Sequence, residues 1–129
     1  MNVMGIGIDT VDIDRFSRVA EDKGRTFLLK IFTEKEIDYA KTKKAKYMHM
    51  AGKFAAKEAV KKALPNGKEI GLNWFDIEIL NGEDGKPYAQ LHGRAKKLME
   101  EFNLSQVLVS VSHTDKTAIS NAMVVKHGS

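Results

Sequence analysis

The chain has 129 residues, which suits one domain and lets about two thirds of the unfolded surface become buried. With 43% hydrophobic and 29% charged residues it is globular, which excludes intrinsic disorder, and the lack of cysteine excludes disulfides and thiolate metal sites. A net charge of +4 leaves nucleic acid, a membrane surface, a phosphorylated small molecule or an acidic protein as candidate partners. No signal peptide or membrane-spanning run is recognisable, so we expect a cytoplasmic protein.

The N-terminal part predicts a strand followed by a helix. Residues 3–9 form an apolar run that contains Gly5 and Gly7, which is typical of a buried strand that another backbone or a ligand approaches closely. A helix is expected over about 12–21. Residues 27–32 are apolar but ambiguous between helix and strand.

Two further helices are expected before the middle of the chain. Thr33 and Glu36 form a capping box, which predicts a helix from about 34 to 43. A longer central helix is expected over about 46–64, because the Pro-Asn-Gly sequence at 65–67 ends it.

The second half predicts strands around one helix. Phe75, Ile77 and Ile79 alternate with polar residues, which indicates a half-buried strand with these three on one face. The expected elements are strands at about 74–80 and 87–91, a helix at 93–102 with Phe102 on its core side, and strands at 107–112 and 117–125. The fold class is therefore α+β, with an antiparallel meander packed on a long central helix.

The central helix carries an acid on an apolar face. Phe54, Glu58 and Lys62 lie four residues apart and share one face, beside alanines. An inward carboxylate there needs a partner or a metal. An ordinary Glu58–Lys62 ion pair, worth a few tenths of a kcal/mol, is one interpretation. A functional carboxylate is the other.

Several short motifs occur in a fixed order along the chain. They are G-I-D at 7–9, R-F at 15–16, F-A-A-K-E-A at 54–59, G-K-P at 85–87 and S-x-S-H at 110–113. Together they resemble the holo-acyl-carrier-protein synthase family, the small single-half members of the 4′-phosphopantetheinyl transferases. The resemblance covers nearly the whole chain, so it implies one transferase domain over residues 1–129 with the fold of that superfamily.

The resemblance implies transfer of 4′-phosphopantetheine from coenzyme A to a serine of an acyl carrier protein. It makes Asp9 and Glu58 ligands of Mg²⁺, which is typically held by one or two carboxylates together with substrate phosphates. From sequence alone, Asp9 could equally be a cap or turn former at the end of its strand. Lys62 would neutralise the pyrophosphate. Glu58, directly or through a metal-bound water, would take the serine proton.

The same resemblance assigns residues to coenzyme A. His113 would contact its 3′-phosphate, with Lys86 and Pro87 in the same wall, although the G-K-P sequence is also a hairpin turn. Lys44 would be a phosphate contact, although basic runs of this kind are usually solvated helix ends. Lys53 replaces the usual arginine of the family motif, which keeps the charge but loses bidentate geometry.

Basic residues of the first helix are candidates for docking the acidic carrier protein. Arg15 and Arg18 lie on it and Arg25 lies at its exit, and a solvated basic surface is the alternative interpretation. Because the chain is about half as long as two-lobed relatives, the resemblance also implies a homotrimer with sites between subunits. A basic RNA-binding domain is the competing function, but no strand carries an aromatic stacking pair and the two acids would have no use there.

Overall fold

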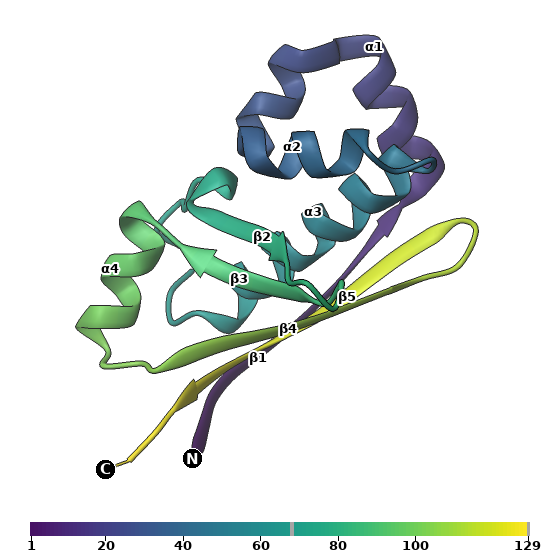
Figure 1. Cartoon of the computed structure of the whole chain (residues 1–129). Coiled ribbons are helices and arrows are strands. Elements are labelled where there is room, and N and C mark those ends of the chain that lie inside the picture. The colour runs from purple at the N-terminus through teal and green to yellow at the C-terminus, as the bar shows by residue number, and fades with distance from the viewer. Residues whose placement is uncertain (68, 129) are drawn as a thin grey trace.

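The chain contains helices and two antiparallel sheets, as the α+β class predicts (Figure 1). The computed structural model describes residues 1–67 and 69–128. Its elements are β1 Asn2–Asp12, α1 Ile13–Ile31, α2 Glu34–Lys41, α3 Lys46–Ala63, the 3₁₀ turn η1 Trp74–Asp76, β2 Ile77–Asn81, β3 Pro87–Leu91, α4 Gly93–Glu101, β4 Gln106–His113 and β5 Thr117–Lys126. None of the helices within the described residues is long and apolar enough to cross a membrane.

The sheets do not form the single meander expected from the sequence. The larger sheet has the order β1-β5-β4, so the first strand pairs with the last, and β2 with β3 forms a separate two-stranded sheet. Three helices follow β1 before the next strand, so β1 cannot form a hairpin with its neighbour in sequence. It pairs instead with β5, where Gly7 lies opposite Ala122.

Helix α3 packs closely against β1 and lies between two hydrophobic clusters. A Cβ atom at Gly7 would lie 2.1 Å from the Ala59 carbonyl oxygen, and one at Gly5 would lie 2.0 Å from that of Ala63. Only glycine permits such an approach, so the prediction of a close backbone contact is confirmed. The approach brings the Asp9 end of β1 alongside α3.

The first helix extends further than the sequence indicated. It runs to Ile31 and includes most of the ambiguous apolar run, with an interruption at Gly24, whose φ is 67°. Buried apolar contacts explain the extension, because Phe16 packs against both Phe27 and Phe32. The capping box at Thr33 is present, so the predicted start of α2 is confirmed.

Three other expectations are corrected in and around the second sheet. Residues Trp74–Asp76 form a 3₁₀ turn, and the strand begins only at Ile77. Ile77 and Ile79 are fully buried, but Phe75 is 41% exposed and does not share their face. Phe102 caps the end of α4 and is also 41% exposed, so it does not join the core side of that helix.

Candidate active site

Two lysines, not an acid, are the ionic groups that α3 buries. Lys53 and Lys57 are 5% and 0% exposed, whereas Glu58 is half-buried beside them. The expectation that Glu58 is the inward charge of this helix is therefore wrong. Ala55 and Ala56, between the two lysines in sequence, are fully buried as well.

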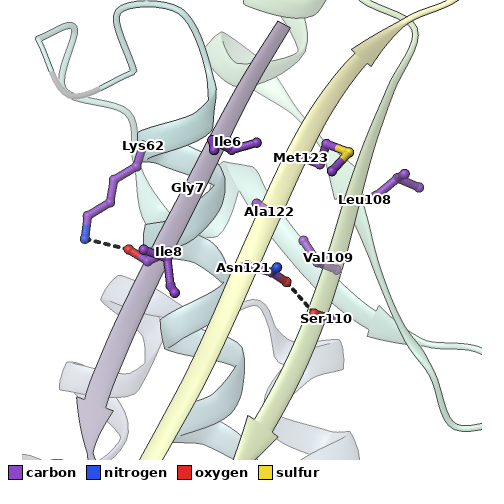
Figure 2. A pocket seen from close by; sticks show the side chains of 10 residues that line it. All are labelled: Ile6, Gly7, Ile8, Lys62, Leu108, Val109, Ser110, Asn121, Ala122 and Met123. Atoms are coloured by element: carbon purple, nitrogen blue, oxygen red, sulfur yellow. Dashed lines mark hydrogen bonds between the residues drawn. The ribbon is translucent and has the colours of Figure 1, made fainter. Parts of the chain in front are cut away.

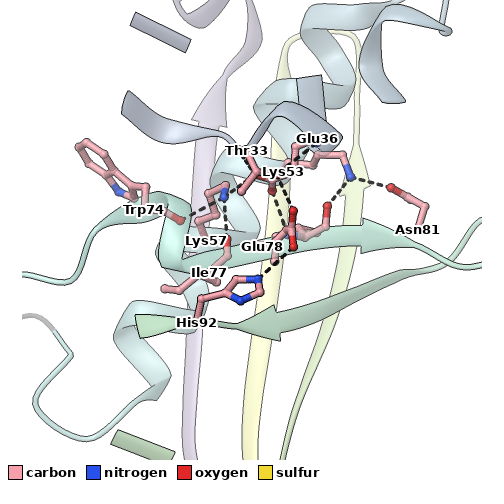
Figure 3. A network of polar contacts seen from close by, with 10 residues as sticks. Thr33, Glu36, Lys53, Lys57, Trp74, Ile77, Glu78, Asn81 and His92 are labelled. Atoms are coloured by element: carbon pink, nitrogen blue, oxygen red, sulfur yellow. Dashed lines mark hydrogen bonds and ion pairs between the residues drawn. The ribbon is translucent and has the colours of Figure 1, made fainter. Parts of the chain in front are cut away.

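Lys57 is fully hydrogen-bonded inside the protein (Figure 3). Its Nζ donates to Glu36 Oε1 at 2.8 Å, to the Ile77 carbonyl at 2.6 Å and to the Trp74 carbonyl at 3.1 Å. Glu36 Oε2 accepts from the Ile79 amide at 2.8 Å. Burial lowers the pKa of Lys57. This closed ion pair connects α2, α3 and β2, and it uses all three N–H donors of the lysine.

Glu78 extends the same network toward α4. Its Oε2 accepts from Thr33 Oγ1 at 2.6 Å, and its Oε1 lies 3.0 Å from His92 Nε2 (Figure 3). Burial acts to raise the pKa of Glu78, but the hydrogen bonds with Thr33 and His92 outweigh it and lower the pKa. The network therefore joins the start of α2, the strand β2 and the residue that precedes α4.

Lys53 is held in a similar way, one helical turn earlier. Its Nζ donates to the Ile79 carbonyl and to Asn81 Oδ1, each at 2.6 Å, and lies 4.8 Å from the centre of the Tyr39 ring. Burial lowers its pKa to about 8. Two of its three N–H donors are occupied, so at most one remains for a ligand.

Asp9 and Lys62 face each other across β1 and α3. Lys62 Nζ lies 3.0 Å from Asp9 Oδ1 and 2.9 Å from the Ile8 carbonyl oxygen. The side chains are 33% and 20% exposed for Lys62 and Asp9, respectively. Lys62 thus pairs with Asp9 and forms no ion pair with Glu58 in the described chain. Asp9 does not end its strand, which continues to Asp12, and Asp12 is the residue that caps α1.

Glu58 and Asp9 line one cavity of about 590 Å³ between β1, α1 and α3. Its wall is mostly apolar, and Arg15 also borders it. Glu58 Oε1 accepts a hydrogen bond from the indole Nε1 of Trp74. Asp9 Oδ2 and Glu58 Oε2 accept none from any residue that the structure describes. Two hard oxygen donors with free lone pairs suit a hydrated Mg²⁺ that also binds phosphate oxygens.

Trp74 is the residue of this cavity that sequence reasoning missed. A signal was available, because Trp74 is the only tryptophan of the chain and a buried indole N–H usually needs an acceptor. What the sequence could not show is that the acceptor lies sixteen residues earlier, at Glu58.

The residues expected to bind coenzyme A are only partly brought together. Pro87 and His113 line a second cavity, of about 190 Å³, together with Lys53 and Asn81. Lys86 follows the turn beside it, and Lys44 lies in the exposed turn before α3. Neither of these two lysines lines either cavity.

The three arginines of α1 have different surroundings. Arg15 borders the Asp9–Glu58 cavity, and Arg18 is exposed one turn further along the helix. Arg25 lies beyond the interruption at Gly24 and forms an exposed ion pair with Glu34 at 3.3 Å.

The face of the large sheet that α3 does not cover is unusually apolar (Figure 2). A broad hollow of about 820 Å³ lies over it. Ile6 is 71%, Ile8 is 59% and Leu108 is 41% exposed there. Large contiguous apolar patches of this kind usually mark an interaction surface.

Comparison with known proteins gives one consistent result. The statistical model of the 4′-phosphopantetheinyl transferase superfamily matches residues 5–119. A holo-[acyl-carrier-protein] synthase of Geobacter metallireducens is 42% identical over 123 residues, which are 95% of this chain and 96% of that protein. One of Caldanaerobacter subterraneus is 40% identical and covers 93% of each chain.

Solved structures agree with the sequence comparison. The holo-ACP synthase of Plasmodium yoelii superposes with a TM-score of 0.83 at 30% identity and covers 98% of both chains. The Helicobacter pylori holo-[acyl-carrier-protein] synthase, solved in complex with coenzyme A, gives a TM-score of 0.79 at 35% identity and covers 92% of this chain and 98% of that one. The chain therefore belongs to the 4′-phosphopantetheinyl transferase superfamily and, within it, to the holo-acyl-carrier-protein synthases.

Proposed function

We propose that the Asp9–Glu58 cavity is where this chain transfers 4′-phosphopantetheine from coenzyme A to a serine of apo acyl carrier protein. The transferase activity follows from the family. The products would be holo carrier protein and adenosine 3′,5′-bisphosphate, and the process served would be fatty acid biosynthesis. The observation that supports this location is the convergence of Asp9 from β1 and Glu58 from α3 on one cavity, with Lys62 held against Asp9.

The reaction makes one bond and breaks one bond at phosphorus. The serine oxygen attacks the phosphorus that bears pantetheine, and the bond to the bridging pyrophosphate oxygen breaks. Glu58 Oε2 accepts no hydrogen bond from the described residues, so Glu58 is the group that takes the serine proton, directly or through a bound water. Lys62 balances charge on the departing phosphate.

Asp9 and Glu58 would also hold Mg²⁺, since their free oxygens are the donors that this ion prefers. Bound there, the ion would neutralise the pyrophosphate and orient it for in-line displacement. Two carboxylates are a sparse set, and no group of three or more metal-ligating side chains occurs in the described part of the chain. Substrate phosphate oxygens and water are expected to complete the shell.

We assign the coenzyme A nucleotide to the cavity of Pro87 and His113. Lys53 lies in its wall, and Lys86 and Lys44 lie on the exposed segments nearby in sequence, where they could reach phosphates. The cavity is distinct from that of Asp9 and Glu58, so one chain by itself offers two separated parts of a site.

A cyclic homotrimer would join these parts. The apolar outer face of the β1-β5-β4 sheet provides a surface for assembly, and in a closed ring each interface joins two different surfaces (Figure 2). Asp9, Glu58 and Lys62 of one subunit would then meet Lys86 and His113 of its neighbour.

Subunit mixing tests the shared site. Glu58→Gln and His113→Ala proteins should each be nearly inactive. Refolded together in equal amounts, they should regain roughly a quarter of the activity, because random assortment leaves about that fraction of interfaces with two intact walls. A mixture that stays inactive while light scattering shows mixed trimers contradicts the shared site.

The carrier protein is expected to dock on α1. Arg15 borders the cavity and Arg18 is exposed beside it, so an acidic helix next to the acceptor serine would meet complementary charge there. Arg25 would contribute less, because Glu34 already neutralises it.

Mass spectrometry of the carrier protein tests the activity itself. Incubation of the purified chain with apo carrier protein, coenzyme A and Mg²⁺ should add one phosphopantetheine mass, and a chelator should abolish the addition. No mass change by folded protein, or the same change with and without the chelator, contradicts the proposed activity or its metal dependence, respectively.

A further inference from the structure

Two consecutive residues of α3 form hydrogen bonds with Trp74, one with its backbone carbonyl and one with its indole ring. Lys57 Nζ donates to its backbone carbonyl at 3.1 Å (Figure 3). Its indole Nε1 donates to Glu58 Oε1. Lys57 is itself fixed by the buried Glu36. The backbone of Trp74 is therefore anchored to the protein interior, while its side chain reaches the cavity that contains Asp9.

The indole ring is also fixed from its sides by α3. The Phe54 ring lies 5.6 Å away, centre to centre, at an interplanar angle of 70°, and Lys61 Nζ lies 5.1 Å from the ring centre. Positions 54, 58 and 61 share one face of the helix by their i, i+4, i+7 spacing. One helical face thus surrounds the indole, which restricts it to a single orientation.

From this geometry we propose that Trp74 is a positioning residue for Glu58. The indole occupies Oε1, so it fixes the rotation of the carboxylate and leaves Oε2 as the oxygen for the serine proton or the metal. A glutamate side chain has three rotatable bonds, and without this contact it would sample several orientations at the cavity wall. The inference rests on the proposed function, because it assumes that Glu58 acts in the transfer.

A purely structural Trp74 is the alternative. It would matter only for packing against Phe54, and an equally large ring without the N–H would serve as well. Because the chain has no second tryptophan, the N–H can be removed selectively. Benzothienylalanine at position 74 keeps a fused bicyclic ring of nearly the same shape and replaces the N–H by sulfur.

The test compares wild-type protein with benzothienylalanine at position 74, Trp74→Phe, and Phe75→Leu as the control on the same turn. Phe75 is exposed and lines neither cavity described above. We expect the benzothienylalanine protein to melt like wild type but to show kcat about tenfold lower with KM for coenzyme A within about twofold, as for a group that acts in the transition state. Phe75→Leu should keep the wild-type kcat.

A spectroscopic measurement separates positioning from packing. Fluorotryptophan incorporated at position 74 gives a single ¹⁹F resonance, since the chain has one tryptophan. Glu58→Gln should shift this resonance, and so should Mg²⁺ added together with coenzyme A.

The outcomes distinguish the inference from the function on which it rests. A benzothienylalanine protein with wild-type kcat, next to an inactive Glu58→Gln, overturns the role of Trp74 and leaves the proposed function standing. Wild-type activity in Glu58→Gln, or no transfer by the wild-type chain, overturns the proposed function and the inference with it. If Trp74→Phe unfolds, the benzothienylalanine protein still decides the matter.

Discussion

The charged side chains on the two sides of α3 differ in burial and in hydrogen bonding. On the side toward β2, Lys57 and Glu36 are completely buried and their hydrogen bonds are closed within the chain. On the side toward β1, Asp9 and Glu58 line an open cavity, and each keeps one carboxylate oxygen without a donor among the residues that the structure describes. Neighbouring residues on a helix point about 100° apart, so Lys57 and Glu58 can serve separate surroundings.

This difference indicates that Lys57 and Glu58, the K-E pair of the motif, have separate roles. Lys57 fixes the relative positions of three elements, because its donors reach Glu36 in α2, Trp74 in the 3₁₀ turn and Ile77 in β2. In the proposed function, Glu58 is available to substrate because that framework holds the cavity wall in place. A buried charged group whose hydrogen-bonding positions are all occupied by the protein cannot also bind a substrate. A group with one unoccupied position can.

Removing the buried lysine should cause the largest loss of stability. Lys57→Met leaves the Glu36 carboxylate buried without its cation, which typically costs about 3–5 kcal/mol of unfolding free energy. Urea unfolding followed by Trp74 fluorescence measures it. Lys62→Met is the matched control on the same helix, and its partly exposed pair should contribute less than about 1 kcal/mol.

The double variant Lys57→Met with Glu36→Leu sharpens this prediction. Removal of both charges should recover part of the lost stability, since no unpaired ion is left in the interior. A Lys57→Met protein as stable as Lys62→Met would show that the two sides of α3 do not differ as described.

On the open side, loss of charge should affect rate rather than stability. Asp9→Asn should lower kcat by roughly a hundredfold, equivalent to about 2.7 kcal/mol, because it weakens stabilisation of the transferring phosphate. Its melting temperature should stay near that of wild type, since Asp9 is partly exposed. In steady-state rates measured against Mg²⁺ concentration, the half-maximal Mg²⁺ concentration should also rise, because the variant lacks one of the proposed metal ligands. An unchanged rate contradicts the assignment of Asp9.

The buried side should also respond to pH. Burial lowers the pKa of Lys53 to about 8, below the usual 10.5 of an unfolded lysine. Between these values the unfolded state binds more protons, so this group makes stability rise with pH from about 8 to 10.5; below about 8 both states are protonated and its contribution no longer changes with pH. Lys53→Met should remove that rise, on the order of 3 kcal/mol, in urea melts across this range. A wild-type and variant difference that does not depend on pH contradicts a buried, charged Lys53.

The smallest expected effects concern α1, outside both regions. Arg15→Glu or Arg18→Glu should weaken carrier-protein binding about tenfold and leave coenzyme A affinity near normal, with a smaller effect at high salt. Arg25→Glu should do less because of its pair with Glu34. Lys97→Glu on α4 is the control. Equal losses for both substrates would mean that α1 supports the fold rather than docking a partner.

Local signals in the sequence predicted several elements well. The capping box at Thr33 and the stop at residues 65–67 gave the helices α2 and α3 within a few residues, because caps act through adjacent backbone groups. The glycine pair of β1 indicated close packing, which Gly7 confirms against Ala59. The motif order indicated the family, and with it the transfer reaction.

Contacts distant in sequence were not predictable in the same way. The pairing of β1 with β5, the burial of Lys57 by Glu36 and the hydrogen bond from Trp74 to Glu58 all join separate segments. Helical spacing suggested Lys62 as the partner of Glu58, yet the close approach of β1 offers Asp9 to Lys62 instead. Tertiary packing decided these pairs, and a single sequence carries no direct signal of it.

The most direct test compares Glu58→Gln with Glu36→Gln in two measurements on the same samples, the free energy of unfolding and the single-turnover transfer rate. We predict that Glu58→Gln unfolds within about 0.5 kcal/mol of wild type but transfers at least about a hundredfold more slowly. Glu36→Gln should lose stability, and under conditions where it is folded it should keep a much larger share of the rate. If Glu58→Gln keeps its rate, or loses stability as Glu36→Gln does, the division of α3 into a structural and a chemical side is wrong.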